Sequence, residues 1–274
     1  MKFVVYERVA IFLAAEQRVL TGNVFWTWCA RVAWVLLPFT AGVALSNALD
    51  SWSRGPAIVA IVFLWAAWLA GAIALLAPRP WGFAVLRVVA PVALVTAALA
   101  DASGVTRAVG VATAAIATVL ALGAQIARAS ANALAYGDED RYPLTVPSTL
   151  AFVPLPLAVA VVALGLVSGP LLLADGRVVL GLFALVAGLP LAALAANSVF
   201  SLSRRWFVLV PAGVVIVDPL TLADPVLLPR EQLASITAGG RDRRDFALDL
   251  RLGAAPGALT IRLREAAPFV RRRG

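Results

Sequence analysis

The chain contains six long apolar runs, which are separated by short segments that carry charged residues. A helix crosses the hydrocarbon core of a bilayer with roughly 17 to 25 mostly apolar residues, and each run reaches that length. No run contains a carboxylate. The runs cover residues 25–49, 56–77, 84–100, 109–127, 148–169 and 178–200. The pattern predicts a membrane protein of the all-α class, a six-transmembrane-helix bundle with a small cytoplasmic C-terminal β-rich domain.

The composition argues against a water-soluble domain and against an enzyme. Hydrophobic residues make up 62% of the chain and charged residues 14%, whereas soluble domains carry about 25% charged residues. The sequence has no histidine and one cysteine, Cys29, which lies inside the first run and is interpreted as a small apolar side chain. The sequence shows no metal cluster, nucleophile motif or phosphate-binding loop. We therefore expect no catalytic residues and no cofactor.

Residues 1–24 precede the first run and are interrupted by charges that include Glu7, Arg8 and Glu16. A cleavable signal peptide has an uninterrupted apolar core, so we expect this segment to stay attached. Many of its apolar residues fall on one helical face, which predicts a cytoplasmic amphipathic segment at the membrane interface. An ordinary leader helix is the alternative interpretation.

The basic residues lie mostly on one side of the six runs. Arginine and lysine near the spans resist translocation and mark the cytoplasmic face. That face holds the N-terminal segment, the second and fourth connections, and every arginine from Arg204 onward. The opposite face holds only Arg54, Arg107 and Arg177. We predict a multi-pass protein of the plasma membrane with both termini in the cytoplasm.

The runs contain few charged groups that could bind a substrate. Arg31 and Arg87 lie near the predicted cytoplasmic ends, where a long side chain reaches the interface. The remaining polar residues are of the kinds that join helices to one another. Gly110, Ala114 and Thr118 recur on one face of the fourth run. Small residues at this spacing let another helix approach closely, which predicts that this run packs in the interior of the bundle.

Prolines interrupt several runs, and the pair Pro154 and Pro156 predicts the strongest break. A proline inside a helix removes a backbone hydrogen bond and kinks the chain. We interpret the prolines as packed kinks. Broken helices that line a substrate cavity are the alternative.

Three successive acids, Asp138, Glu139 and Asp140, lie between the fourth and fifth runs. Calcium loops place their ligands at alternate positions and end on a distant carboxylate, a pattern that this segment lacks. We therefore predict ion pairs with nearby arginines instead of a metal site.

The composition changes after Phe200 from continuously apolar to alternating. We assign residues 25–202 to the transmembrane domain and residues 203–274 to the cytoplasmic β-rich domain. Runs rich in β-forming residues, separated by Pro, Gly and Asp turns, predict strands. They cover residues 206–210, 214–217, 226–228, 233–237, 246–252 and 258–263. Alternation of apolar and polar residues in the last two runs predicts a hairpin between them.

The tail contains the stretch RRWFVLVPAGVVIVDP at residues 204–219, followed by ADPVLLPR at residues 223–230. This tail resembles that of a group of actinobacterial integral membrane proteins of uncharacterised function and, more distantly, bacterial pleckstrin-homology-like domains. The resemblance is confined to the tail. It implies a small sheet or partial barrel that binds a ligand at the cytoplasmic face of the membrane, and it implies no catalytic residues.

Basic and aromatic residues of the tail are the predicted binding residues, because they suit an anionic membrane interface. They are Arg204, Arg205, Trp206, Arg241, Arg243 and Arg244. We expect a non-enzymatic scaffold or regulator that recruits a protein partner or anionic lipid through this domain, with a homo-oligomer as one way to complete a small sheet. The net charge of +8 is explained by the membrane and does not require nucleic acid. The alternative is a transporter or flippase of a lipid or a neutral small molecule.

Overall fold

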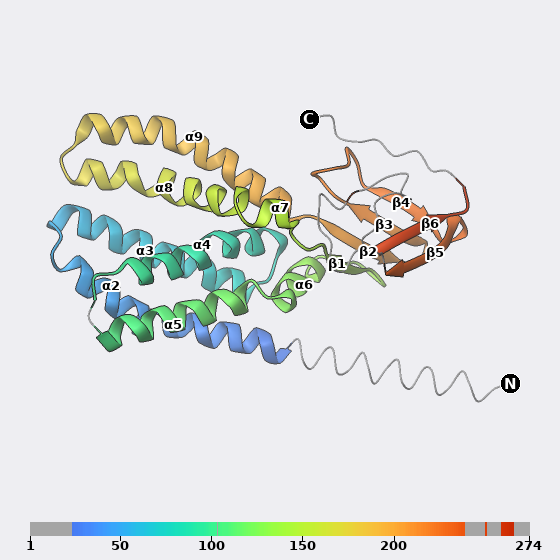
Figure 1. Ribbon diagram of the computed structural model, residues 1–274, viewed down its shortest axis with the longest axis horizontal. Helices are drawn as coiled ribbons and strands as arrows, with labels where there is room; N and C mark the ends of the chain where they lie inside the picture. Colours follow the sequence, from blue (N-terminus) through green and yellow to red (C-terminus); the bar gives the residue numbers. More distant parts are fainter. Residues whose placement is uncertain (1–23, 103, 239–249, 251–258, 266–274) are drawn as a thin grey trace.

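The computed structural model describes residues 24–102, 104–238, 250 and 259–265. Within these residues the chain is mostly helical, and a small sheet region follows on the C-terminal side. The long helices form one elongated body, and the strands lie beyond one end of it (Figure 1). The predicted N-terminal amphipathic segment falls almost entirely outside the described residues.

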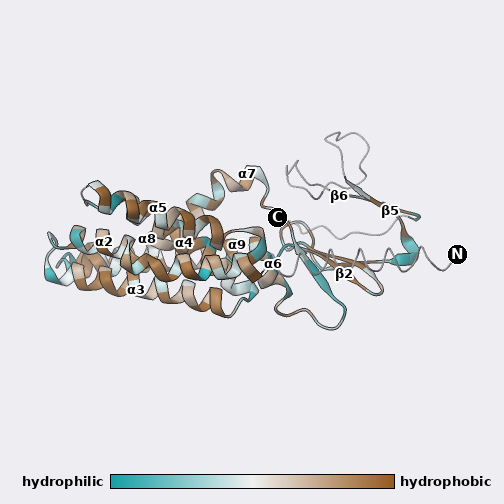
Figure 2. Cartoon of the chain, turned by 90° about the horizontal axis from the view of Figure 1, so that it is seen from below, coloured by the Kyte–Doolittle hydropathy of each residue, from teal (hydrophilic) through white to brown (hydrophobic). Residues whose placement is uncertain are grey.

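Six helical stretches are long and apolar enough to cross a membrane, as the six runs predict. They are Val24–Leu49, Arg54–Leu76 (α3), Pro80–Leu99 (α4), Gly104–Ala121 (α5), Ser148–Ala174 and Val178–Ser203 (α9). Hydrophobic residues recur along the whole length of these helices (Figure 2). Phe183 on α9 and Val119 on α5, for example, are 73% and 72% exposed.

Proline breaks the first and the fifth of these stretches. Residues 24–36 are helical, a 3-10 turn at Leu37–Phe39 (η1) contains Pro38, and the helix resumes at Ala41–Leu49 (α2). The fifth stretch consists of Ser148–Ala151 (α7) and Pro154–Ala174 (α8). Pro154 begins the second helix, which confirms the predicted break, because a proline suits the first turn of a helix, where its missing N–H would have no partner.

The fourth stretch ends earlier than predicted. The apolar run predicts a helix to residue 127, whereas α5 ends at Ala121 and a separate short helix covers Ala124–Asn132 (α6). Gly123 between them has an extended backbone, with φ −62° and ψ 154°. The predicted boundary was wrong because the apolar composition continues across this break in the backbone.

Small residues bring the helices close together. A Cβ atom on Gly165 of α8 would lie only 2.5 Å from the carbonyl oxygen of Gly188 on α9. Gly110 and Ala114 of α5 are buried, which confirms their predicted packing role. A Cβ on Gly110 would lie 3.1 Å from the Cα of Ala41. Small side chains therefore set the spacing at these crossings.

Two tryptophans join the first stretch to α3. Trp34 Nε1 donates to the carbonyl oxygen of Trp68 at 2.9 Å, and Trp68 Nε1 donates to that of Trp34 at 3.0 Å. A side chain on Gly71 would overlap the indole ring of Trp34. The glycine therefore makes room for this reciprocal pair.

The main sheet has four antiparallel strands in the order β1-β2-β3-β4. They are Asp140–Pro143 (β1), Trp206–Val210 (β2), Gly213–Val217 (β3) and Val226–Pro229 (β4). β1 lies in the connection between α6 and α7, inside the range assigned to the transmembrane domain. The backbone N–H of Leu144 also donates to the carbonyl oxygen of Arg205 at 2.9 Å, so the pairing continues past the strand. The sheet is therefore built from two segments that lie far apart in the sequence.

The strands β2, β3 and β4, with Leu233–Ala238 (β5) and Leu259–Leu263 (β6), confirm five of the predicted β runs. β5 and β6 pair with each other as a second, two-stranded sheet. The predicted run at residues 246–252 lies outside the described residues apart from Leu250. The predicted hairpin with that run therefore stays a prediction.

Candidate functional site at the helix–sheet junction

We define the junction as α6, β1, β2 and the turn after β3, together with the ends of α4 and α9 that lie beside them. Its centre is a buried ion pair. Arg205 donates from Nε and Nη2 to Oδ1 and Oδ2 of Asp218, at 2.9 and 2.8 Å. The two side chains are only 3% and 1% exposed. Asp218 also accepts the backbone N–H of Leu220 at 3.1 Å, so the pair fixes the turn after β3 against β2.

A second arginine connects α4 to the end of α9. Arg87 donates from Nη1 to Ser203 Oγ at 2.9 Å, and that hydroxyl donates to the carbonyl oxygen of Val199 at 2.9 Å. The guanidinium group also lies over the ring of Phe83, 4.7 Å from its centroid. Arg87 thus holds the end of α9 in place immediately before β2 begins.

Asn132, the last residue of α6, binds β1 as a neighbouring strand would. Its Nδ2 donates to the carbonyl oxygen of Arg141 at 2.8 Å, and the N–H of Arg141 donates to its Oδ1 at 2.7 Å. An amide side chain carries both a donor and an acceptor, so it can match both backbone groups of one residue. This contact attaches the helical body to the outer edge of the sheet.

Two of the three acids of the connection, Asp140 and Glu139, pair with arginines, as predicted. Arg128 Nη2 lies 2.9 Å from Asp140 Oδ2, and Arg141 Nε lies 2.9 Å from Glu139 Oε1. The hydrogen bond from Arg141 lowers the pKa of Glu139. Within the described residues, no group of three or more His, Cys, Asp or Glu side chains could hold a metal ion.

Aromatic rings complete the contact between α6, β1 and β2. Arg128 lies over the ring of Tyr142, 4.6 Å from its centroid, and Arg141 lies over the ring of Trp206 at 5.1 Å. The hydrogen bond with Asp140 raises the pKa of the Tyr142 hydroxyl. Each arginine therefore contacts both a carboxylate and an aromatic face, an arrangement that suits its planar guanidinium.

The structure separates the predicted binding residues. Arg205 and Trp206 are buried, and Trp206 packs in a small core with Ala131. Arg204 is exposed, with its guanidinium over the ring of Phe200 at 5.4 Å. Arg241, Arg243 and Arg244 lie outside the described residues. Among the described members of the set, Arg204 is the one that presents its charge at the surface.

Sequence reasoning missed Asn132 and Asp218. Asn132 stands alone among alanines, and nothing around it indicates a strand as its partner. Asp218 follows a β run directly, which is a weak signal that a turn carboxylate could face the sheet.

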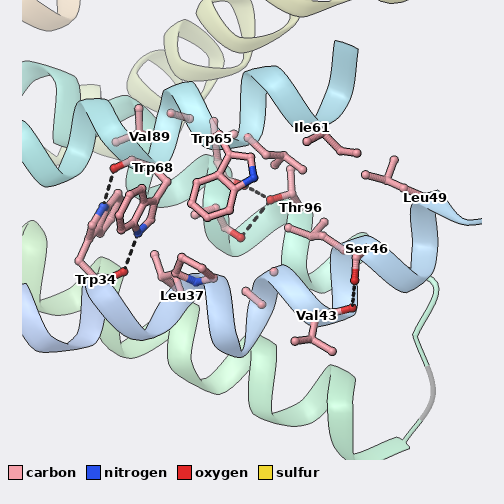
Figure 3. Close-up of a pocket in the computed structure, with 18 residues that line it drawn as sticks. Trp34, Leu37, Val43, Ser46, Leu49, Ile61, Trp65, Trp68, Val89 and Thr96 are labelled. Carbon is pink, nitrogen blue, oxygen red and sulfur yellow. Dashed lines mark hydrogen bonds between the residues drawn. The ribbon is translucent and has the colours of Figure 1, made fainter. Parts of the chain in front are cut away.

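A cavity of about 400 Å³ lies within the helical body, between α2, α3 and α4 (Figure 3). Its lining is largely apolar and includes the indole rings of Trp34, Trp65 and Trp68. Two hydroxyl groups, those of Ser46 and Thr96, also face it. No charged side chain is among the residues that line it.

Comparison of the chain with protein-family models, with curated proteins and with solved structures gave no match. The resemblance of the tail to actinobacterial membrane proteins and pleckstrin-homology-like domains therefore stays a prediction.

Proposed function

We propose that this chain is a plasma-membrane protein that spans the bilayer six times, with both termini in the cytoplasm. In this proposal the helices hold a sheet at the cytoplasmic face, and the sheet recruits a protein partner or anionic lipid headgroups. The observation that carries the proposal is the pairing of β1 with β2, which ties the tail to a connection between two long apolar helices. A tail attached in this way has a set position relative to the membrane surface.

The exposed apolar surface of the helices supports the membrane placement, because soluble proteins rarely expose large contiguous apolar patches. The sidedness is supported by the ends of the helices. Arg54 begins α3, Arg107 lies in α5 near its start, and Arg177 precedes α9, all at the end remote from the strands (Figure 1). The basic connections and the tail lie at the other end, as expected for a cytoplasmic face.

Exposed arginine beside the sheet supports the recruiting role. Arg204 stands at the end of α9, where the apolar surface gives way to the strands, and Phe200 lies beneath it. An arginine near an anionic membrane surface gains about 1 kcal/mol. The arginines at 241, 243 and 244 add to this charge in the proposal.

Cysteine labelling tests the topology. In a Cys29→Ala background, single cysteines are introduced as Ser53→Cys and Gly239→Cys, and intact cells are treated with an impermeant maleimide. We expect Ser53→Cys to be labelled, and Gly239→Cys to be labelled only after the membrane is permeabilised. The opposite pattern would overturn the proposed orientation.

Lipid retention tests the recruiting role. Native mass spectrometry of the purified full-length protein counts the phosphatidylglycerol and phosphatidylcholine molecules that remain bound during delipidation. We expect Arg204→Glu, and the triple change to Glu at 241, 243 and 244, to reduce retained phosphatidylglycerol selectively. Arg177→Glu, an exposed charge at the opposite end, is the matched control and should retain it. Equal retention in all variants would reject lipid recruitment and leave a protein partner as the expected ligand.

A further inference from the structure

We infer that the cavity between α2, α3 and α4 binds one acyl chain of a membrane phospholipid. The inference rests on the membrane placement proposed above and is independent of recruitment by the sheet. It is carried by the chemistry of the lining, the position of the opening and the break at Pro38.

The lining offers an occupant few polar groups, and its two hydroxyl groups are already bonded within their own helices. Ser46 Oγ donates to the carbonyl oxygen of Val43 at 2.9 Å, and Thr96 Oγ1 donates to that of Val92 at 2.9 Å. Both hydroxyl hydrogens are therefore used within their helices. A sugar, amino acid or ion would lose most of its hydration here without replacement, which is costly. An unbranched hydrocarbon has no such hydration to lose.

The volume also suits a hydrocarbon chain. About 400 Å³ lies within the range of roughly 300 to 1,000 Å³ that is common for small-molecule pockets. Apolar cavities of this kind stay dry, since water finds too few partners in them. Hydrocarbon therefore fills the space better than water does.

The cavity opens on the side of the helical body. Val43, Ile61 and Trp65 line it, and yet they are 44%, 44% and 54% exposed. In the membrane placement proposed above, this opening faces the lipid chains. The cavity extends from Leu49, beside the predicted outer connection, inward to Trp34 (Figure 3). A lipid of the outer leaflet can thus insert a chain without moving its headgroup.

The break at Pro38 creates the space. The 3-10 turn separates residues 24–36 from α2, and both Pro38 and Gly42 line the cavity. A Cβ on Gly42 would meet only ordinary contacts, 3.5 Å to the carbonyl oxygen of Leu37 and 3.9 Å to Pro38 Cβ. Close helix packing therefore does not require this glycine, in contrast to Gly71. The absence of a side chain at Gly42 keeps the cavity open.

Photocrosslinking tests the inference. The purified full-length protein is reconstituted with phosphatidylcholine that carries a diazirine on one acyl chain, and adducts are mapped by peptide mass spectrometry. We expect adducts concentrated on residues 37–49, 61–68 and 89–96. Gly42→Leu should reduce them about tenfold, which corresponds to about 1.4 kcal/mol of binding free energy. Ala193→Leu adds the same bulk to an exposed position of α9, which does not line the cavity, and should leave them unchanged.

Adducts spread evenly over all six stretches would overturn the inference, as would equal labelling of the two leucine variants. The adduct map of the unsubstituted protein decides the question even if Gly42→Leu does not fold. A zwitterionic probe separates this result from anionic recruitment, and cysteine labelling tests the membrane placement independently.

Discussion

Two arginines of the helical body bind backbone carbonyl groups at the ends of helices. Arg31 donates from Nε to the carbonyl oxygen of Leu75 at 3.1 Å, and Arg107 donates from Nη2 to that of Ala98 at 2.6 Å. Both acceptors lie in the last turn of a helix, where carbonyl groups have no partner within the helix. The negative end of the helix dipole favours a cation there.

Arginines at the junction bind carboxylates instead. Arg205 pairs with Asp218 through two hydrogen bonds, and Arg128 pairs with Asp140. The Arg205 pair is buried, whereas the Arg128 side chain is 32% exposed. The junction therefore contains carboxylates of the kind that the six long stretches exclude.

This difference shows which parts of the chain can accommodate an ion pair. A helix end provides an acceptor without adding a second charge to an apolar region, and a charge at membrane depth is costly. The junction is a protein interior, where a cation is tolerated if a carboxylate and good geometry accompany it. The change from carbonyl to carboxylate partners thus marks the end of the apolar helical body.

The largest effect should come from breaking the buried pair. Asp218→Ala leaves Arg205 buried without a counter-charge, and the loss of one partner of a buried pair costs about 3–5 kcal/mol. Amide hydrogen exchange of β2 and β3 in the purified full-length protein measures the local opening. We expect exchange there to accelerate by at least about 100-fold, at 1.4 kcal/mol for each factor of ten.

Asp175→Ala provides the matched control. Asp175 pairs with Arg177 at a similar N···O distance, 2.9 Å. The Asp175 side chain, however, is 43% exposed and the Arg177 side chain 62% exposed. An exposed pair contributes about 0–1 kcal/mol, so exchange should change little. Similar effects from the two variants would show that burial does not distinguish these ion pairs.

An intermediate effect is expected from Asn132→Ala. The variant leaves the N–H and carbonyl group of Arg141 without their partner on α6, at a cost of about 1–3 kcal/mol if both stay buried. Exchange should accelerate at β1 more than at β3. Asn197→Ala, an exposed amide on α9, is the control and should leave β1 unchanged. Unaltered exchange at β1 in Asn132→Ala would mean that β2 alone holds this strand.

The sequence predicts the long helices well because apolar length is a local property that needs no knowledge of the fold. It does not predict β1, since Asp140–Pro143 contains two charges and a proline. Its strand conformation comes from β2 on one side and Asn132 on the other, and such context outweighs intrinsic preference. Arg205 was assigned to the membrane interface because Trp206 follows it. Its partner, Asp218, lies 13 residues away and is identified only by the sheet.

The smallest effect concerns acid pH at β1. The hydrogen bond from Arg141 lowers the pKa of Glu139 from its ordinary value of 4.5 in the folded protein. The pair therefore stabilises the folded state above pH 4.5, and this contribution is lost as the pH falls through the lowered pKa. Glu139→Gln should flatten the rise in β1 exchange on acidification, by less than the Asn132→Ala effect, since such pairs contribute at most about 1 kcal/mol. Asp224→Asn, at an exposed position before β4, should keep the rise. If both variants keep it, Glu139 is not the group through which acid weakens the junction.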